Sequence, residues 1–165
     1  MNKKLFIASI SFLLVFTVMR FQGEALKTAV TPGGILNLEF ANSPAKLIIV
    51  LTSWDLITVK QNIWIDFLFI PSYVFLFSLL AAFSARKWRH HFFSSLGAIL
   101  VKAMFVAGVL DIAENLLMLQ SIAENYTPSS LWLTYYCAGI KFFIVLLTVL
   151  YIFISIPVML KNNKL

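Results

Sequence analysis

Ionisable and amide side chains interrupt two long apolar stretches of this sequence. Asp111, Glu114 and Asn115 lie within the stretch 96–119, and Lys141 lies within the next one. An ionisable group in hydrocarbon costs several kcal/mol unless it pairs, faces a cavity or lines a pathway. We therefore expect any chemistry of the protein to be concentrated at these residues.

The spacing of the first three residues predicts that they act together. On a helix that turns about 100° per residue, Asp111, Glu114 and Asn115 project from one face. That face must point towards neighbouring helices, because a carboxylate that faces lipid is far costlier. Lys141 reaches a depth similar to that of Asp111 when each is counted along its own stretch, so we expect the ammonium to pair with Asp111 or Glu114.

Two further polar residues lie in the stretch 63–85. Asp66 is near its beginning, and Tyr73 follows seven residues later on the same helical face. A phenol near the middle of a membrane needs a hydrogen-bond partner, and Pro71 between the two frees a backbone carbonyl. The candidate site, called the polar cluster below, comprises Asp66, Tyr73, Asp111, Glu114, Asn115 and Lys141.

Three kinds of role fit such a cluster. It can serve only to hold helices in register, with each polar interaction contributing about 0.6 to about 2 kcal/mol. It can use Asp111 and Glu114 as acid and base, because two nearby carboxyls in a low dielectric have separated pKa values. It can also bind or carry a lipidic or protonated substrate, with Lys141 as a third polar group. No motif in the sequence decides among these roles.

Composition identifies the class of protein. Of the 165 residues, 61% are hydrophobic, 15% are aromatic and only 12% are charged, whereas a soluble domain has about 25% charged residues. The chain is therefore an integral membrane protein that has the lipid bilayer as its partner. The net charge of +6 comes from short basic clusters beside apolar segments, which favours a topogenic role over nucleic-acid binding.

Cofactor and metal motifs are missing from the sequence. The single Cys137 cannot form an intrachain disulfide, and thiolate ligation of a metal is disfavoured without a second cysteine. The adjacent His90 and His91 point in different directions on a helix and read as part of a basic loop. We find no phosphate-binding glycine loop and no nucleophile elbow, so we expect no cofactor and no metal.

Four segments approach the length of about 20 residues that a membrane-spanning helix needs. They are 5–19, 63–85, 96–119 and 131–160. The first could also be a cleaved signal peptide, since residues 23–25 loosely resemble a cleavage site. We favour an uncleaved anchor, because Arg20 and Phe21 lie where a motif of small residues would begin.

The basic residues predict the orientation of these spans. Basic clusters precede the first span, follow the second and follow the fourth, whereas the connection 120–130 contains no Lys or Arg. The positive-inside rule then places both termini, Arg89 and Lys164 in the cytoplasm of a cell, with Ser129 outside. The long outer segment 20–62 contains four basic residues, but Glu24, Glu39 and Asp55 are mixed among them.

The outer segment has a helix of its own. Ser43-Pro44 reads as an N-cap followed by proline at the first helical position, which predicts a helix from Pro44 to about Lys60. This helix is too short to cross a bilayer and too apolar for water, so we expect it at the outer interface. It either seals the bundle or acts as a lid over a pocket that opens outward.

Three segments carry a resemblance to a known group of proteins. They read NLEFANSPAK at 37–46, DFLFIPSYVF at 66–75 and AGVLDIAENLLML at 107–119. Together they resemble small, uncharacterised bacterial membrane proteins with four spans, and the combination of Asp66 with Asp111 and Glu114 is the most specific part. The resemblance covers most of the chain beyond the first span. It implies a bacterial inner membrane and carries over no activity.

The sequence therefore predicts an all-α protein, a single four-helix transmembrane bundle with an additional interfacial helix in the first outer loop. For its function we favour a non-enzymatic role, as an accessory subunit of another membrane protein or a small binding module for a lipidic ligand. The alternative is a small membrane catalyst or carrier that uses the polar cluster. A carrier requires an open path to Asp111 and Glu114, whereas an accessory protein would have them packed and dry.

Overall fold

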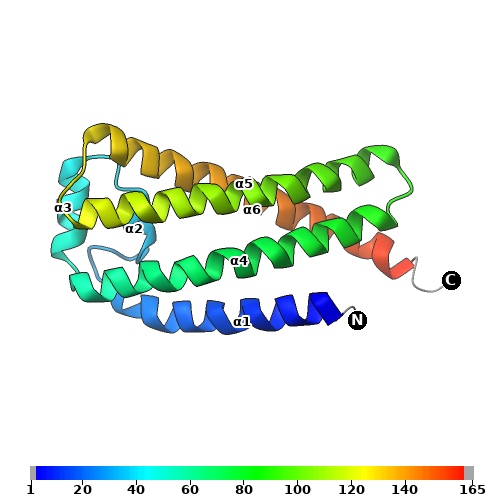
Figure 1. Cartoon of the computed structure of the whole chain (residues 1–165), viewed down its shortest axis with the longest axis horizontal. Helices are drawn as coiled ribbons and strands as arrows, with labels where there is room; N and C mark the ends of the chain where they lie inside the picture. Colours follow the sequence, from blue (N-terminus) through cyan, green and yellow to red (C-terminus); the bar gives the residue numbers. More distant parts are fainter. Residues whose placement is uncertain (1–2, 162–165) are drawn as a thin grey trace.

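The protein is an all-α bundle, and its four long helices confirm the predicted fold class. The computed structural model describes residues 3–161, with side chains as far as Val158, so Lys164 lies outside the described residues. All four helices are long and apolar enough to cross a membrane. They are α1 (Lys3–Gly23), α4 (Leu56–Lys87), α5 (His91–Ile122) and α6 (Pro128–Lys161) (Figure 1).

The start of α1 lies at the same end of the bundle as the α4–α5 connection, and α6 ends there too (Figure 1). We call this the proximal end and the opposite one the distal end. The segment between α1 and α4 covers the distal end. It contains a 3-10 helix, η1 (Glu24–Leu26), and two short α-helices, α2 (Leu36–Glu39) and α3 (Pro44–Thr52).

Helix α3 begins as predicted but is shorter than expected. Its N-cap is Ser43, whose side chain accepts a hydrogen bond from the Lys46 backbone, and Pro44 follows. The helix ends at Thr52, so the prediction of a single helix to about Lys60 is wrong. The physical reason is a second cap, because the Asp55 carboxylate accepts a hydrogen bond of 2.9 Å from the Thr58 backbone amide and starts α4 there.

The other helices extend beyond their apolar segments. Helix α4 has 32 residues and α5 also has 32, whereas the prediction counted only residues that lie in hydrocarbon. Helix α1 continues through Arg20 and Phe21 to Gly23. At the start of α6, Thr127 and Ser130 exchange hydrogen bonds between side chain and backbone, which is a capping box before a helix with proline at its first position.

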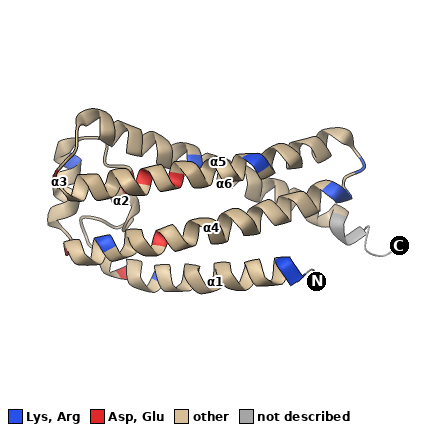
Figure 2. Ribbon diagram, in the orientation of Figure 1, with Lys and Arg blue, Asp and Glu red and all other residues tan. Residues whose placement is uncertain are grey.

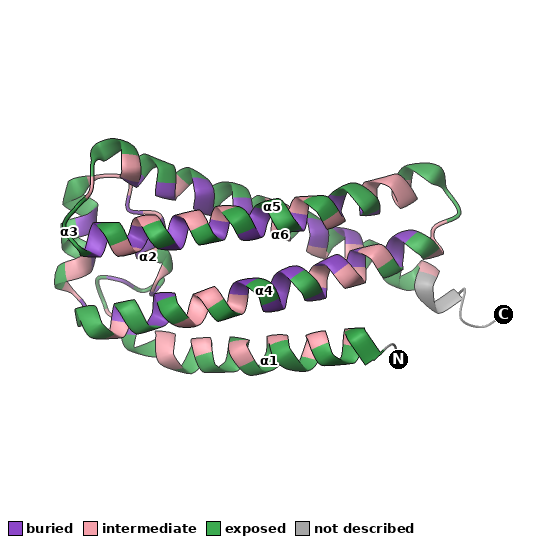
Figure 3. Cartoon of the chain, viewed as in Figure 1, coloured by how far each residue is buried: buried purple, intermediate pink, exposed green. Residues whose placement is uncertain are grey.

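Helix α4 is central in the arrangement of the long helices. It packs against α1 on one side and against α5 and α6 on the other, and α5 also packs against α6. Helix α1 has no buried residue, whereas α4 and α5 bury their inward faces (Figure 3). Phe12 holds α1 against α4, with its ring centroid 5.5 Å from that of Phe69 and 5.7 Å from that of Phe77. Helix α1 therefore forms a side wall of the bundle.

The distal segment folds back into the bundle and shares its core. Leu26 and Leu38 are buried there together with Leu47 of α3 and Ile63 of α4. The indole of Trp54 donates hydrogen bonds to the Leu26 carbonyl at 2.7 Å and to the Thr31 hydroxyl at 2.9 Å. These contacts hold the segment 24–39 against the distal end of the bundle, with Leu26, Leu38 and Glu39 buried.

Candidate functional site

Lys141 of α6 lies at the centre of the polar cluster. Its Nζ donates hydrogen bonds to Asp111 Oδ1 at 2.6 Å and to Glu114 Oε1 at 3.0 Å. Only 6% of the Lys141 side-chain surface is exposed, and Glu114 is completely buried. The predicted pairing of α5 with α6 through an ion pair is therefore confirmed.

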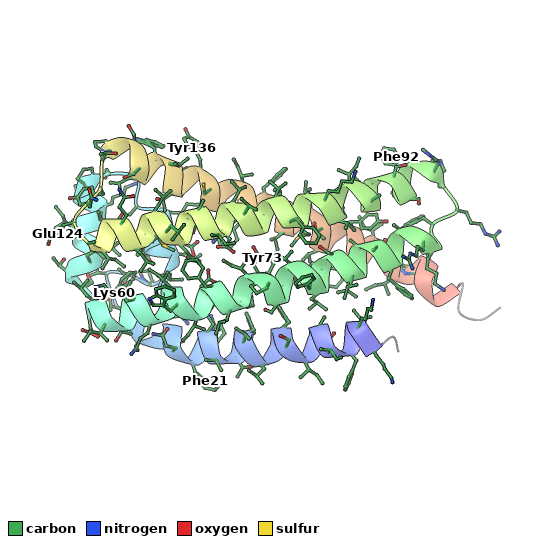
Figure 4. The ribbon with its side chains drawn as sticks, viewed as in Figure 1. Phe21, Lys60, Tyr73, Phe92, Glu124 and Tyr136 are labelled. Atoms are coloured by element: carbon green, nitrogen blue, oxygen red, sulfur yellow. The ribbon has the colours of Figure 1, made fainter. Side chains whose placement is uncertain are left out.

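Two side chains of α4 complete the contacts with α5. The Tyr73 hydroxyl, which lies between α4 and α5 (Figure 4), donates a hydrogen bond of 2.8 Å to Asp111 Oδ2. The Asn115 amide donates one of 2.7 Å to Asp66 Oδ2. All six residues predicted for the polar cluster are thus brought together, although their role is not tested by this geometry.

Glu39 of α2 also belongs to the polar cluster, and the name includes it from here on. Its carboxylate lies 3.8 Å from Lys141 Nζ, and only 8% of its side-chain surface is exposed. Burial raises the pKa of Glu39 above its ordinary value, and the Lys141 ammonium opposes this rise. Glu39 was expected only as one of the acidic residues mixed into the outer segment, and its approach to Lys141 was not predicted because it depends on α2 folding into the bundle.

A signal for Glu39 exists in the sequence. It stands between Leu38 and Phe40, in a short segment where Leu36 is also apolar. A carboxylate with apolar neighbours on both sides, outside any predicted span, indicates a segment that is buried rather than dissolved in water. The Glu39 side chain was missed because the predicted helices stop on either side of it.

A cavity of about 350 Å³ lies beside the polar cluster. Its lining combines acidic and amide groups with apolar walls from α1, α4 and α6. The polar lining residues within the cluster are Glu39, Asp66, Tyr73, Asp111, Asn115 and Lys141. Glu114 is absent from this lining, since it is packed behind Lys141.

The cavity reaches the surface of the bundle between α1 and α6. Phe16 of α1 is 39% exposed and Phe142 of α6 is 41% exposed, and both line the cavity. Arg20 of α1 is another exposed residue at this edge. In Figure 2 the acidic residues of α4 and α5 lie away from the ends of these helices. Two of them, Asp66 and Asp111, line the cavity together with the exposed rings of Phe16 and Phe142, so the cavity connects these carboxylates to an apolar surface.

The covering of the cavity differs from the prediction. A pocket under the helix 44–60 was expected, and α3 does line a separate pocket through Lys46, Ile49 and Val50. Residues 44–60 do not line the cavity beside the polar cluster, which on this side consists of Gly33, Gly34, Ile35, Leu36 and Glu39. The reason is that α3 packs on the outer side of the distal core through Leu47 and Val50. The segment 33–39 therefore separates α3 from the cavity.

The acidic residues do not form a metal site. Among the residues that the structure describes, no group of three or more His, Cys, Asp or Glu side chains could hold a metal ion. The Lys141 ammonium occupies the point at which three of the carboxylates converge. What the arrangement offers instead is a set of hydrogen-bond acceptors beside an apolar cavity.

Comparisons with known proteins add no further identification. No protein-family model, no curated protein and no solved structure matches the chain. The fold and the site therefore define only the class of protein. It is a four-helix membrane bundle with a charged cluster and a cavity inside it.

Proposed function

We propose that this integral membrane protein is a binding module for a small amphiphilic molecule. The polar group of the ligand lies at the polar cluster, and its apolar part lies against the side chains of α1 and α6. We further propose the bacterial inner membrane as its location, with both termini in the cytoplasm. The cytoplasmic orientation is supported by the basic loop at Arg86–Arg89 and by the uncharged connection 120–130.

The observation that carries this proposal is that one cavity is lined both by carboxylates of the polar cluster and by apolar side chains. Asp66 and Asp111 line the same cavity as Phe12, Phe16 and Val145. A cluster that only held helices in register would be packed on all sides, as Glu114 is. The cavity volume of about 350 Å³ lies within the range of about 300 to about 1,000 Å³ that is usual for ligand sites.

The edge between α1 and α6 supports entry from the bilayer. Helix α1 packs mainly against α4, so α1 and α6 can carry apolar side chains on either side of an opening. A ligand that is dissolved in lipid reaches such an opening without crossing water. The apolar walls then favour an alkyl or prenyl chain over a fully polar solute.

A carrier would need a second path at the proximal end. There the Trp88 indole donates a hydrogen bond of 2.8 Å to Ser155 Oγ, and the Tyr151 hydroxyl donates one of 3.0 Å to the Phe93 carbonyl. The Trp88 and Phe93 rings are stacked with centroids 4.3 Å apart. These contacts tie α4, α5 and α6 together, which supports binding at one side over transport through the bundle.

The proposal is tested by filling the cavity. Val145 lines the cavity, whereas its neighbour Leu146 is 54% exposed on the lipid side of α6. The variants Val145→Trp and Leu146→Trp add similar bulk to adjacent positions of one helix. Binding of tritiated dodecanol to the purified protein in lipid nanodiscs is measured against empty nanodiscs.

We expect saturable dodecanol binding to the wild type and to Leu146→Trp, and a loss of at least about tenfold in affinity for Val145→Trp, equivalent to about 1.4 kcal/mol. Thermal unfolding of both variants checks that the bundle is intact. Equal binding by the two variants, or binding no greater than that of empty nanodiscs, would contradict the proposed function.

A further inference from the structure

The polar cluster has more carboxyl groups than cations. Glu39, Asp66, Asp111 and Glu114 supply the carboxyls, and Lys141 supplies the ammonium. Within the described part of the chain, Asp66 has no cation within ion-pair distance, and the Asn115 amide is its hydrogen-bond donor. Asp66 is also half-buried and lines the cavity. Its carboxylate is therefore presented to whatever occupies the cavity.

Unpaired acceptors point to the same place. Among the described residues, Glu39 Oε2 and Asn115 Oδ1 have no hydrogen-bond partner. Glu39 is 6% exposed and Asn115 is 1% exposed, and both line the cavity. A buried acceptor without a donor costs about 1 to about 3 kcal/mol. Both oxygens are closed off from the cavity space, so they add negative potential beside Asp66 without contacting a ligand themselves.

An anionic group is disfavoured at the same position. Lys141 already donates to Asp111 and Glu114, so its charge is compensated. Lys27, which also lines the cavity, forms an ion pair of 2.7 Å with Glu24. Arg20 also lines the cavity, but it is exposed. A carboxylate or phosphate beside Asp66 would meet like charge.

The aromatic lining suits a positive charge. Phe12, Phe69 and Phe77 line the cavity from α1 and α4, and their rings pack against one another. Ring faces attract cations, and the attraction is larger where the cation has lost its water. The same rings accept an alkyl chain through apolar contact.

We infer that the cavity recognises an amphiphile with a primary amine, whose ammonium donates hydrogen bonds to the Asp66 carboxylate. This inference rests on the proposed function, since it names the chemical class of the ligand for the same cavity. The alkyl chain of the amine extends from the polar cluster between α1 and α6.

The test uses ligands that share one chain. Tritiated dodecylamine, dodecanol and dodecanoate are titrated into nanodiscs of a neutral lipid that contain the full chain, at neutral pH, where the amine is an ammonium. We expect dodecylamine to bind at least about tenfold more tightly than dodecanol, as a charge-assisted hydrogen bond allows, and dodecanoate to bind most weakly. Empty nanodiscs correct for partition into lipid.

Variants test which residues cause the preference for dodecylamine over dodecanol. Asp66→Asn keeps the shape and removes the charge, so the affinity ratio of dodecylamine to dodecanol should fall to about one or two. Glu39→Gln should lower the ratio in the same direction and carries the test if Asp66→Asn does not fold. Glu124→Gln changes an exposed carboxylate of the α5–α6 loop (Figure 4) and should leave the ratio unchanged.

Equal affinities for dodecylamine and dodecanol, or tightest binding of dodecanoate, would overturn the inference and leave the proposed function standing. An amine preference that survives in both Asp66→Asn and Glu39→Gln would also overturn it. If no dodecyl compound binds above empty nanodiscs, the proposed function fails and the inference fails with it.

Discussion

The ammonium of Lys141 on α6 lies 2.6 Å from the Asp111 carboxylate on α5, and both side chains are buried. The contact connects two helices that are separated in sequence by the distal loop 123–127. The other Asp111 oxygen accepts the Tyr73 hydroxyl of α4 at 2.8 Å. One carboxylate therefore joins three helices, and the stability of the bundle must depend on its charge balance.

Lys141→Met should destabilise the bundle strongly, because it leaves Asp111 and Glu114 buried without their cation. Removing one partner of a buried pair costs about 3 to about 5 kcal/mol. Lys141→Met combined with Asp111→Asn should lose less, since the amide still accepts the Tyr73 hydroxyl and carries no charge. Thermal unfolding in detergent measures both variants.

Lys102 provides the control for this comparison, since it is an exposed lysine on α5. Lys102→Met should change the free energy of unfolding by no more than about 0.5 kcal/mol. If the losses from Lys141→Met and Asp111→Asn simply add in the double variant, the ion pair does not contribute as described.

Tyr73→Phe should lower stability by about 1.5 to about 3 kcal/mol, because it removes a hydrogen bond to a buried charged acceptor. Tyr136→Phe is the matched control, since Tyr136 is 56% exposed and no hydrogen bond joins its hydroxyl to the described part of the chain. Both variants are compared by thermal unfolding in the same detergent. Similar unfolding temperatures for the two variants would show that the hydrogen bond from Tyr73 to Asp111 does not stabilise the bundle.

Most of the fold could be predicted from the sequence. The polar face of 111–115 and the lone Lys141 were sufficient to predict the contact between α5 and α6, because buried charges in a membrane must find partners. The sequence also predicted that the Tyr73 phenol needs a hydrogen-bond partner, but it did not identify Asp111 as that partner. These inferences rest on helical periodicity, which is independent of the loops.

The distal segment could not be predicted in the same way. The end of α3 at Thr52 was missed although Asp55 is a residue type that favours a helix N-cap. The break depends on Asp55 capping α4 and on the Trp54 indole donating a hydrogen bond to the Leu26 carbonyl. Glu39 enters the cluster only because the tertiary fold carries α2 inward. The cavity is likewise a property of packing, because its walls come from helices that are far apart in the sequence.

Glu39 should make stability depend on pH. Burial raises its pKa above the ordinary 4.5, and its neighbours in the cluster are Lys141, Asp111 and Glu114. The folded state then holds a proton that the unfolded chain has released, so stability falls as pH rises above the ordinary value towards the raised pKa.

Glu39→Gln removes this titration. As pH rises above the ordinary pKa of 4.5, its unfolding temperature should therefore fall less than that of the wild type. Glu124→Gln, at an exposed site, should keep the wild-type dependence. A variant profile parallel to that of the wild type would mean that Glu39 titrates normally in the folded protein.

Cysteine labelling tests the proposed orientation. In a Cys137→Ala background, Arg89→Cys should react with an impermeant maleimide only after the inner face is opened, and Ser129→Cys should react in intact cells. Both positions are exposed, and they lie at opposite ends of the bundle. The reverse labelling pattern would place the distal segment and its cavity on the cytoplasmic side.

Photolabelling tests the binding cavity most directly. Dodecanol with a diazirine at the end of its chain is irradiated with the protein in nanodiscs, and the adducts are mapped by mass spectrometry. We expect adducts on the cavity walls, at Phe12 and Phe16 of α1 and at Phe142 and Val145 of α6, and we expect excess dodecanol to suppress them. Adducts confined to lipid-facing residues such as Leu146, and insensitive to excess dodecanol, would contradict binding inside the bundle.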